Sequence, residues 1–89
     1  MIQSWKDKAA KEAFEGKTPK GFSADVAKAA RRRLAQLDAS AKVEDMRTPP
    51  GNRLHKVGDV WAVWVNDQFR ITFTWGEHGP EDVWLGDYH

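Results

Sequence analysis

The chain has 89 residues, a formal net charge of +1 and no cysteine, which excludes disulfides, a thiolate nucleophile and a Cys-ligated zinc site. A chain of this length forms a single small domain, residues 1–89, with a thin core. No apolar run approaches the roughly 20 residues of a membrane helix, and the polar start is unlike a signal peptide, so we expect a soluble, cytoplasmic protein without membrane contact.

Charge is distributed unevenly along the chain. Residues 1–58 contain 13 Lys and Arg against 7 Asp and Glu, whereas residues 59–89 contain one Arg against six acidic residues. This asymmetry indicates a polyanion or a charged partner on the basic side. Each basic residue taken singly has a plainer interpretation, because Lys and Arg commonly form the solvated face of an amphipathic helix.

The first half of the sequence predicts two helices. Residues 7–15 have a helical composition, and Gly16 offers a left-handed stop. A second helix should begin after Ser23, a suitable N-cap, and run to about Asp38. Its apolar residues recur at helical spacing on one stripe: Val26, Ala30, Leu34 and Leu37.

Shorter elements flank these helices. Residues 2–5 could form a short strand, and residues 41–46 a helical turn. This turn should end before residues 48–51, because a Thr-Pro-Pro-Gly sequence is not expected to be helical.

The second half predicts strands, because its hydrophobic period changes to two. Residues 60–65 are apolar throughout, as in a central strand, whereas residues 69–75 alternate and leave Arg70 on the wetter face. Turns connect them to a third strand around residues 83–85. Helices followed by an antiparallel meander make an α+β fold, with the helices packed on one face of the sheet.

A few side chains are suited to cutting RNA: His55, Arg70, Asp87, Tyr88 and His89. Cleavage by the RNA's own 2′-hydroxyl needs a base, positive charge for the pentavalent phosphorane and an acid for the leaving 5′-oxygen. Histidine suits the first and third because its pKa lies near neutrality, and arginine suits the second because its fork matches phosphate oxygens. No metal and no cofactor is required.

These side chains also have plainer interpretations. His55 could be an ordinary histidine at a strand end. Arg70 could form a surface bridge with Glu81 or Asp82, worth about 0–1 kcal/mol. Tyr88 could be an aromatic at the edge of the core. The three histidines are too dispersed to indicate a metal site.

Four segments, in their order and spacing, resemble the HigB branch of the RelE/ParE toxin superfamily. They are Pro-Pro-Gly-Asn-Arg-Leu at 49–54, Asn-Asp-Gln-Phe-Arg-Ile at 66–71, Gly-Pro-Glu-Asp-Val at 79–83 and the terminal Asp-Tyr-His. The resemblance covers nearly the whole chain and implies a compact RelE-like domain. It also implies a ribosome-dependent messenger-RNA endonuclease, the toxin of a toxin–antitoxin pair. A helix-turn-helix antitoxin, HigA-like, would neutralise it and would provide its only route to operator DNA.

The resemblance also implies roles for individual residues. The cleavage residues become His55, Arg70, Asp87, Tyr88 and His89, with His89 or Asp87 as the base and Arg70 as the phosphate clamp. His55 or Tyr88 would be the other proton carrier or a base-stacking contact. The residues expected to contact RNA or the ribosome are basic: Lys28, Arg31, Arg32, Arg33, Lys42, Arg47, Arg53 and Lys56.

The sequence departs from the family pattern at three places. Trp64 stands where relatives often carry an arginine, the 56–59 connection is a few residues shorter than is common, and position 55 is glutamate in some relatives. Two other functions remain open at this point: a ParE-like gyrase poison without nuclease activity, and a binding module that uses its basic helix and catalyses nothing.

Overall fold

A computed structural model describes residues 1–87; Tyr88 and His89, two of the expected cleavage residues, lie outside the described residues. Two α-helices and two short 3-10 helices precede a four-stranded sheet. In chain order the elements are α1 (Lys8–Phe14), α2 (Ala24–Ala39), η1 (Val43–Arg47), η2 (Pro50–Asn52), β1 (His55–Val57), β2 (Val60–Trp64), β3 (Phe69–Gly76) and β4 (Gly79–Asp87).

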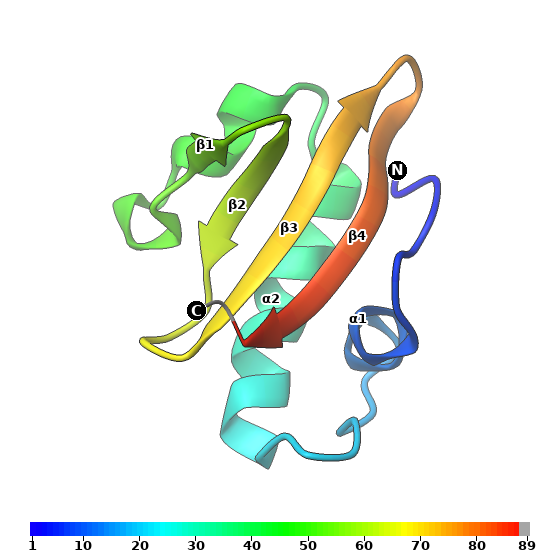
Figure 1. Ribbon diagram of the computed structural model, residues 1–89, viewed down its shortest axis with the longest axis vertical. Coiled ribbons are helices and arrows are strands. Elements are labelled where there is room, and N and C mark those ends of the chain that lie inside the picture. Colours follow the sequence, from blue (N-terminus) through cyan, green and yellow to red (C-terminus); the bar gives the residue numbers. More distant parts are fainter. Residues whose placement is uncertain (88–89) are drawn as a thin grey trace.

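The sheet is an antiparallel meander in the order β1-β2-β3-β4. Figure 1 shows α2 running behind the sheet and α1 beside β4. Buried residues of both helices and of the strands form a single core, so both helices pack on the same face. The expected α+β fold, with N-terminal helices packed on an antiparallel sheet, is therefore confirmed. Within the described residues, no helix is both long and apolar enough to cross a membrane.

Both α-helices begin where the sequence predicts. The Asp7 and Ser23 side chains accept hydrogen bonds from the main-chain N–H groups of Ala10 and Val26, at 3.1 and 3.2 Å. These bonds satisfy donors that the first turn of a helix leaves without a partner. Past the end of α1, Gly16 takes the left-handed conformation (φ 88°) that the sequence predicts for a stop.

The core lies between the helices and one face of the sheet. Register aligns Val63, Ile71 and Leu85 across β2, β3 and β4, and all three are buried against the fully buried Leu34 and Leu37 of α2. Burial of each such side chain contributes about 1.5–3 kcal/mol to the free energy of unfolding. One face of the sheet is thereby committed to the core.

Three local elements differ from the sequence prediction. Residues 2–5 make one bridge, Trp5 to Val83, rather than a strand; two main-chain hydrogen bonds, and a third from Lys6, tie this segment along β4. The expectation that residues 48–51 exclude helix is wrong, because Pro50 opens η2, where its missing N–H is not needed. β1 was not predicted, since three exposed residues leave no hydrophobic alternation to detect.

We expect substitutions of Asp7 to separate its capping role from its charge. Burial raises the pKa of Asp7, partly offset by hydrogen bonds from main-chain N–H groups. The neutral carboxyl of Asp7 therefore stabilises the folded state relative to the unfolded chain. This stabilisation is lost as the pH rises through the pKa that Asp7 has in the folded state. Asp7→Asn keeps the cap, whereas Asp7→Ala should lose about 1 kcal/mol.

Thermal unfolding at about pH 3 and about pH 7, either side of the ordinary Asp pKa, checks this prediction. The Asn variant should gain stability relative to the unsubstituted protein between the two pH values. A relative loss over that interval would show that the carboxylate charge stabilises the cap.

Candidate functional site

The helices leave one face of the sheet uncovered within the described residues, and we call it the outer face. Register places Trp64, Arg70 and Gly86 in one row across β2, β3 and β4. A second row runs from His55 of β1 through Ala62 and Thr72 to Trp84. Because successive strand side chains alternate between faces, both rows lie opposite the core.

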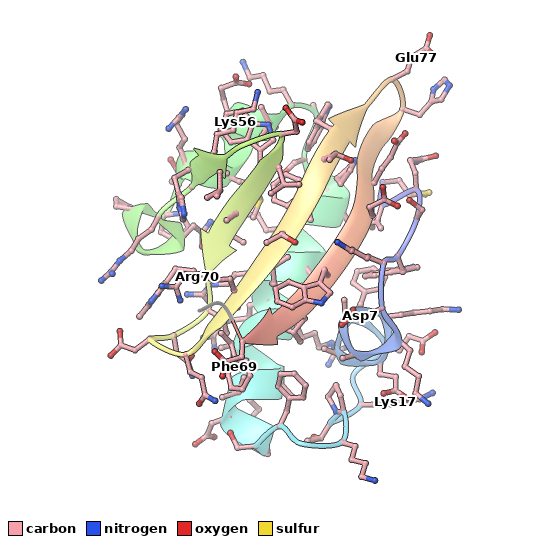
Figure 2. All side chains as sticks on the ribbon, in the orientation of Figure 1. Asp7, Lys17, Lys56, Phe69, Arg70 and Glu77 are labelled. Carbon is pink, nitrogen blue, oxygen red and sulfur yellow. The ribbon has the colours of Figure 1, made fainter. Side chains whose placement is uncertain are left out.

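Arg70 is half-buried and fixed at the turn between β2 and β3. Its Nη1 donates to the main-chain oxygens of Asn66 and Phe69, at 2.6 and 3.1 Å. Figure 2 shows Arg70 at the end of the sheet where β2 runs into this turn. A guanidinium carries five N–H donors, so donors remain for an external anion.

The ion pair considered for Arg70 does not form. Arg70 stands opposite Gly86, whereas Glu81 stands opposite Thr74, further along the sheet. Within residues 1–87 no carboxylate pairs with Arg70. Its positive charge is therefore held in place without an acidic partner in that part of the chain.

A flat aromatic surface adjoins Arg70. The Trp84 indole lies across Gly86 so closely that a Cβ at Gly86 would come within 2.1 Å of a ring carbon. Gly86 thus allows the ring to lie down on the strand next to the row that contains Arg70. Aromatic faces beside cations are typical of single-stranded nucleic-acid sites, because bases stack on them.

His55 lies on the same face but at its β1 edge. It is exposed, and its Nδ1 is 2.8 Å from the main-chain oxygen of Arg53. In the tautomer in which Nδ1 donates this bond, Nε2 keeps a lone pair that can accept a proton. His55 and Arg70 are two strands apart and in different rows, roughly 12 Å between their Cα atoms at the usual strand geometry, so a phosphate served by both would lie between them.

Asp87 ends β4 opposite Phe69, and its Oδ2 accepts a hydrogen bond from Gln68 Nε2 at 3.1 Å. Since Arg70 follows Phe69, alternation directs the Asp87 and Arg70 side chains to opposite faces of the sheet. The structure thus brings Arg70 close to Trp64 and Gly86 rather than to Asp87. Among residues 1–87, no cluster of three or more His, Asp or Glu could hold a metal ion.

The expected RNA-contacting residues fall into separate groups. Lys28 and Arg31 line a hollow between the end of α1 and the start of α2. Arg32 and Arg33 line a second, shallow hollow beside η2. The others are exposed near η1, after η2 and on β1: Lys42, Arg47, Arg53 and Lys56.

Arg33 is used by the fold itself. Its Nε donates to the main-chain oxygen of Trp64 at 2.6 Å, and its Nη1 to that of Ala29 at 3.2 Å. Burial, with a smaller contribution from the neighbouring Arg32, lowers the pKa of Arg33. The side chain therefore ties α2 to the end of β2, at the edge of the outer face.

Two features of the outer face were missed in the sequence. One is the indole of Trp84 lying on Gly86. The sequence signal for it was an aromatic residue and a glycine two positions apart on one strand, since such residues share a face of the sheet. The other is the contact between Arg53, itself an expected RNA-binding residue, and Trp64: the Arg53 Cζ lies 4.4 Å from the centroid of a Trp64 ring. No local pattern links residues 53 and 64, because the contact depends on how η2 meets β2.

Two comparisons with known proteins agree with each other. The family model described as "RelE-like toxin of type II toxin-antitoxin system HigB" matches residues 3–89. Over 80 residues the chain is 35% identical to Toxin HigB-1 of Vibrio cholerae serotype O1, an alignment that covers 84% of each chain. The family match includes every helix and strand described above.

Gly86→Ala should displace the Trp84 ring. Overpacking of this kind costs about 1–3 kcal/mol, and tryptophan emission should shift as the indole moves. Gly51→Ala is the matched control, because no atom lies within 4 Å of a Cβ built there. In a Trp84→Ala background the cost of Gly86→Ala should shrink; an equal cost in both backgrounds, measured by thermal unfolding, would contradict the contact.

Proposed function

Because the chain belongs to the HigB family of RelE-like toxins and is the toxin component of a type II toxin–antitoxin system, we propose that it is an endoribonuclease that cuts messenger RNA in the ribosomal A site. The observation that carries the proposal is Arg70, fixed by two main-chain oxygens on an aromatic face. That arrangement suits a phosphate that gains negative charge during a reaction.

The proposed reaction needs no metal. A base removes the proton of a 2′-hydroxyl, and the resulting oxygen attacks the adjacent phosphorus. The pentavalent phosphorane is stabilised by Arg70 and collapses when an acid protonates the departing 5′-oxygen. The products are a 2′,3′-cyclic phosphate and a free 5′-hydroxyl.

The proton carriers come from the remaining candidate residues. His55 has its Nε2 available on the outer face when its Nδ1 donates to Arg53, which suits a base or an acid near neutral pH. Asp87, Tyr88 and His89 are the other candidates. The base and the acid of the proposed reaction are drawn from these four residues.

The ribosome supplies alignment in this proposal. Holding reacting groups in position lowers a barrier by up to about 7–11 kcal/mol, and the small outer face has few groups to orient RNA by itself. The basic residues Lys28, Arg31, Arg32, Lys42, Arg47 and Lys56 would dock on ribosomal RNA through phosphate contacts. A cognate antitoxin is implied by the family. We propose that this antitoxin is a HigA-like helix-turn-helix protein that binds the toxin in the cytoplasm and carries it to operator DNA.

Induction without the antitoxin tests the proposed function. Growth should stop, and primer extension should find transcripts cut at codon positions when, and only when, they are translated. Intact transcripts together with altered plasmid supercoiling would favour a ParE-like gyrase poison instead. Growth arrest with neither change would indicate a toxin that acts by binding alone.

Arg70→Ala should slow single-turnover cleavage on programmed ribosomes by about 10²- to 10³-fold, corresponding to roughly 2.7–4 kcal/mol of lost transition-state stabilisation. The fold should persist, because Arg70 lies on the outer face and contributes no volume to the core. Thermal unfolding of the same preparation is the control. A variant that unfolds early yet cleaves at the normal rate would assign Arg70 a structural role.

A further inference from the structure

We propose that Arg53, stacked on Trp64, forms a second phosphate-binding site on the outer face, next to the site of Arg70. Its ligand is a phosphate of the messenger RNA strand, adjacent to the phosphate held by Arg70. The proposal rests on the proposed function, because it places RNA on this face.

The backbone of Arg53 is held in a conformation that arginine rarely adopts. It has φ 48° and ψ 48°, in the left-handed region, where glycine is favoured. Its N–H donates to the Pro50 oxygen at 3.0 Å. The preceding Asn52, 1% exposed, donates to Gln36 Oε1 at 3.0 Å and to the Met46 oxygen at 3.1 Å. Arginine at a position suited to glycine indicates that its side chain has a use.

Stacking leaves the guanidinium ready to bind an anion. The Cζ of Arg53 lies over a Trp64 ring, 4.4 Å from its centroid, and because the five N–H donors of arginine point outward around the group, at least one edge of the guanidinium stays free. That edge can donate two parallel hydrogen bonds to phosphate oxygens. Because the stack already restricts the long side chain, little further ordering is needed on binding.

The stacking partner is itself fixed beside Arg70. Trp64 stands directly opposite Arg70 in the register of β2 and β3, and its main-chain oxygen accepts the hydrogen bond from Arg33. One guanidinium, that of Arg53, therefore lies over this indole, and a second arginine, Arg70, stands directly across from Trp64 on the next strand. A strand that places one phosphate at Arg70 would bring the next within reach of Arg53.

The charge around Arg53 favours an anion from outside the chain. Arg53 is exposed, and no carboxylate pairs with it in the part of the chain that the structure describes. Asn52 joins it to the hollow lined by Arg32 and Arg33, which extends the positive surface. A carboxylate of the antitoxin could use the same cation, but the Trp84 indole on this face favours RNA, whose bases stack on aromatic rings.

The test measures binding to ribosomes without cleavage. One ribosome preparation carries a messenger RNA with 2′-O-methyl groups in the A-site codon, which removes the attacking hydroxyls. A second preparation carries a messenger RNA that ends at the P-site codon. Arg53→Gly removes the side chain and suits the backbone, so its Tm should stay close to that of the unsubstituted protein, because the relieved strain is offset by glycine's larger loss of backbone entropy. Lys20→Ala, which removes an exposed cation far along the chain, is the charge-matched control.

With the A-site codon present, Arg53→Gly should weaken binding by roughly ten- to hundredfold, as expected for a lost charge-assisted hydrogen bond. The slope of log affinity against log salt should fall by about 0.7, one phosphate contact on a single strand. Arg53→Lys should keep the slope and part of the affinity. With the codon absent, Arg53→Gly and Lys20→Ala should bind alike. Trp64→Phe, which keeps an aromatic face, should bind better than Trp64→Ala.

Unchanged affinity and slope for Arg53→Gly, with the codon present, would overturn the second phosphate site. A loss of binding confined to the antitoxin would also overturn it, and would assign Arg53 to the protein partner. A lowered Tm with normal ribosome binding would overturn it as well, and would make the Arg53–Trp64 contact a packing contact only. If the unsubstituted protein neither binds programmed ribosomes nor cuts RNA on them, the proposed function itself is wrong. That outcome is distinguishable from the three outcomes above, which concern Arg53 alone.

Discussion

The rest of the structure depends on the burial of one sheet face by α2. Leu34 and Leu37 are fully buried against that face, and so are the strand residues that meet them. A sheet with a single covered face has to carry side chains on the other that tolerate water and still protect the strands. The outer face meets this requirement with indoles, threonines and arginines, so the same constraint that builds the core also builds the candidate site.

The outer face is ordered by contacts that reach it from outside the sheet. Arg33 crosses from α2 to the end of β2, and Asn52 joins η2 to α2 and η1. A buried polar group such as the Asn52 amide is costly unless every donor finds an acceptor, and here the amide finds several. The conformation of residues 49–54 therefore follows from the position of α2, and the placement of Arg53 follows from those residues.

The sequence predicts the fold class because its main signals are local. The Gly16 stop, the Ser23 N-cap with the stripe through Leu34, and the alternation in residues 69–75 each specify one element, and one buried face then assembles them. β1 and η2 escaped prediction because each has three residues and no periodic pattern. The conformation of residues 49–54 depends on tertiary hydrogen bonds that no spacing records.

The candidate site is less predictable than the fold for a related reason. Arg70 could be found from its place on the wetter face of a strand, because alternation is local. The register that sets it beside Trp64 and Gly86, and Asp87 on the opposite face, depends on turn lengths and on the irregularity between Thr72 and Thr74. A shift of one residue in register reverses which side chains share a face, so sequence alone could not pair these groups.

At Arg53, the free-energy cost of the backbone conformation can be compared with the free energy that its contact with Trp64 returns. A left-handed conformation costs a residue with a Cβ roughly 1–2 kcal/mol, and a cation–π contact at an exposed site returns only about 0.5–1 kcal/mol. Glycine would avoid the strain but loses about 0.5–1 kcal/mol more backbone entropy on folding, so arginine and glycine should give the fold similar stability at this position. The fold therefore does not require arginine here, and the proposed phosphate contact gives the side chain a use. That interaction would take place on the outer face, where Arg53 and Arg70 have no acidic partner within residues 1–87.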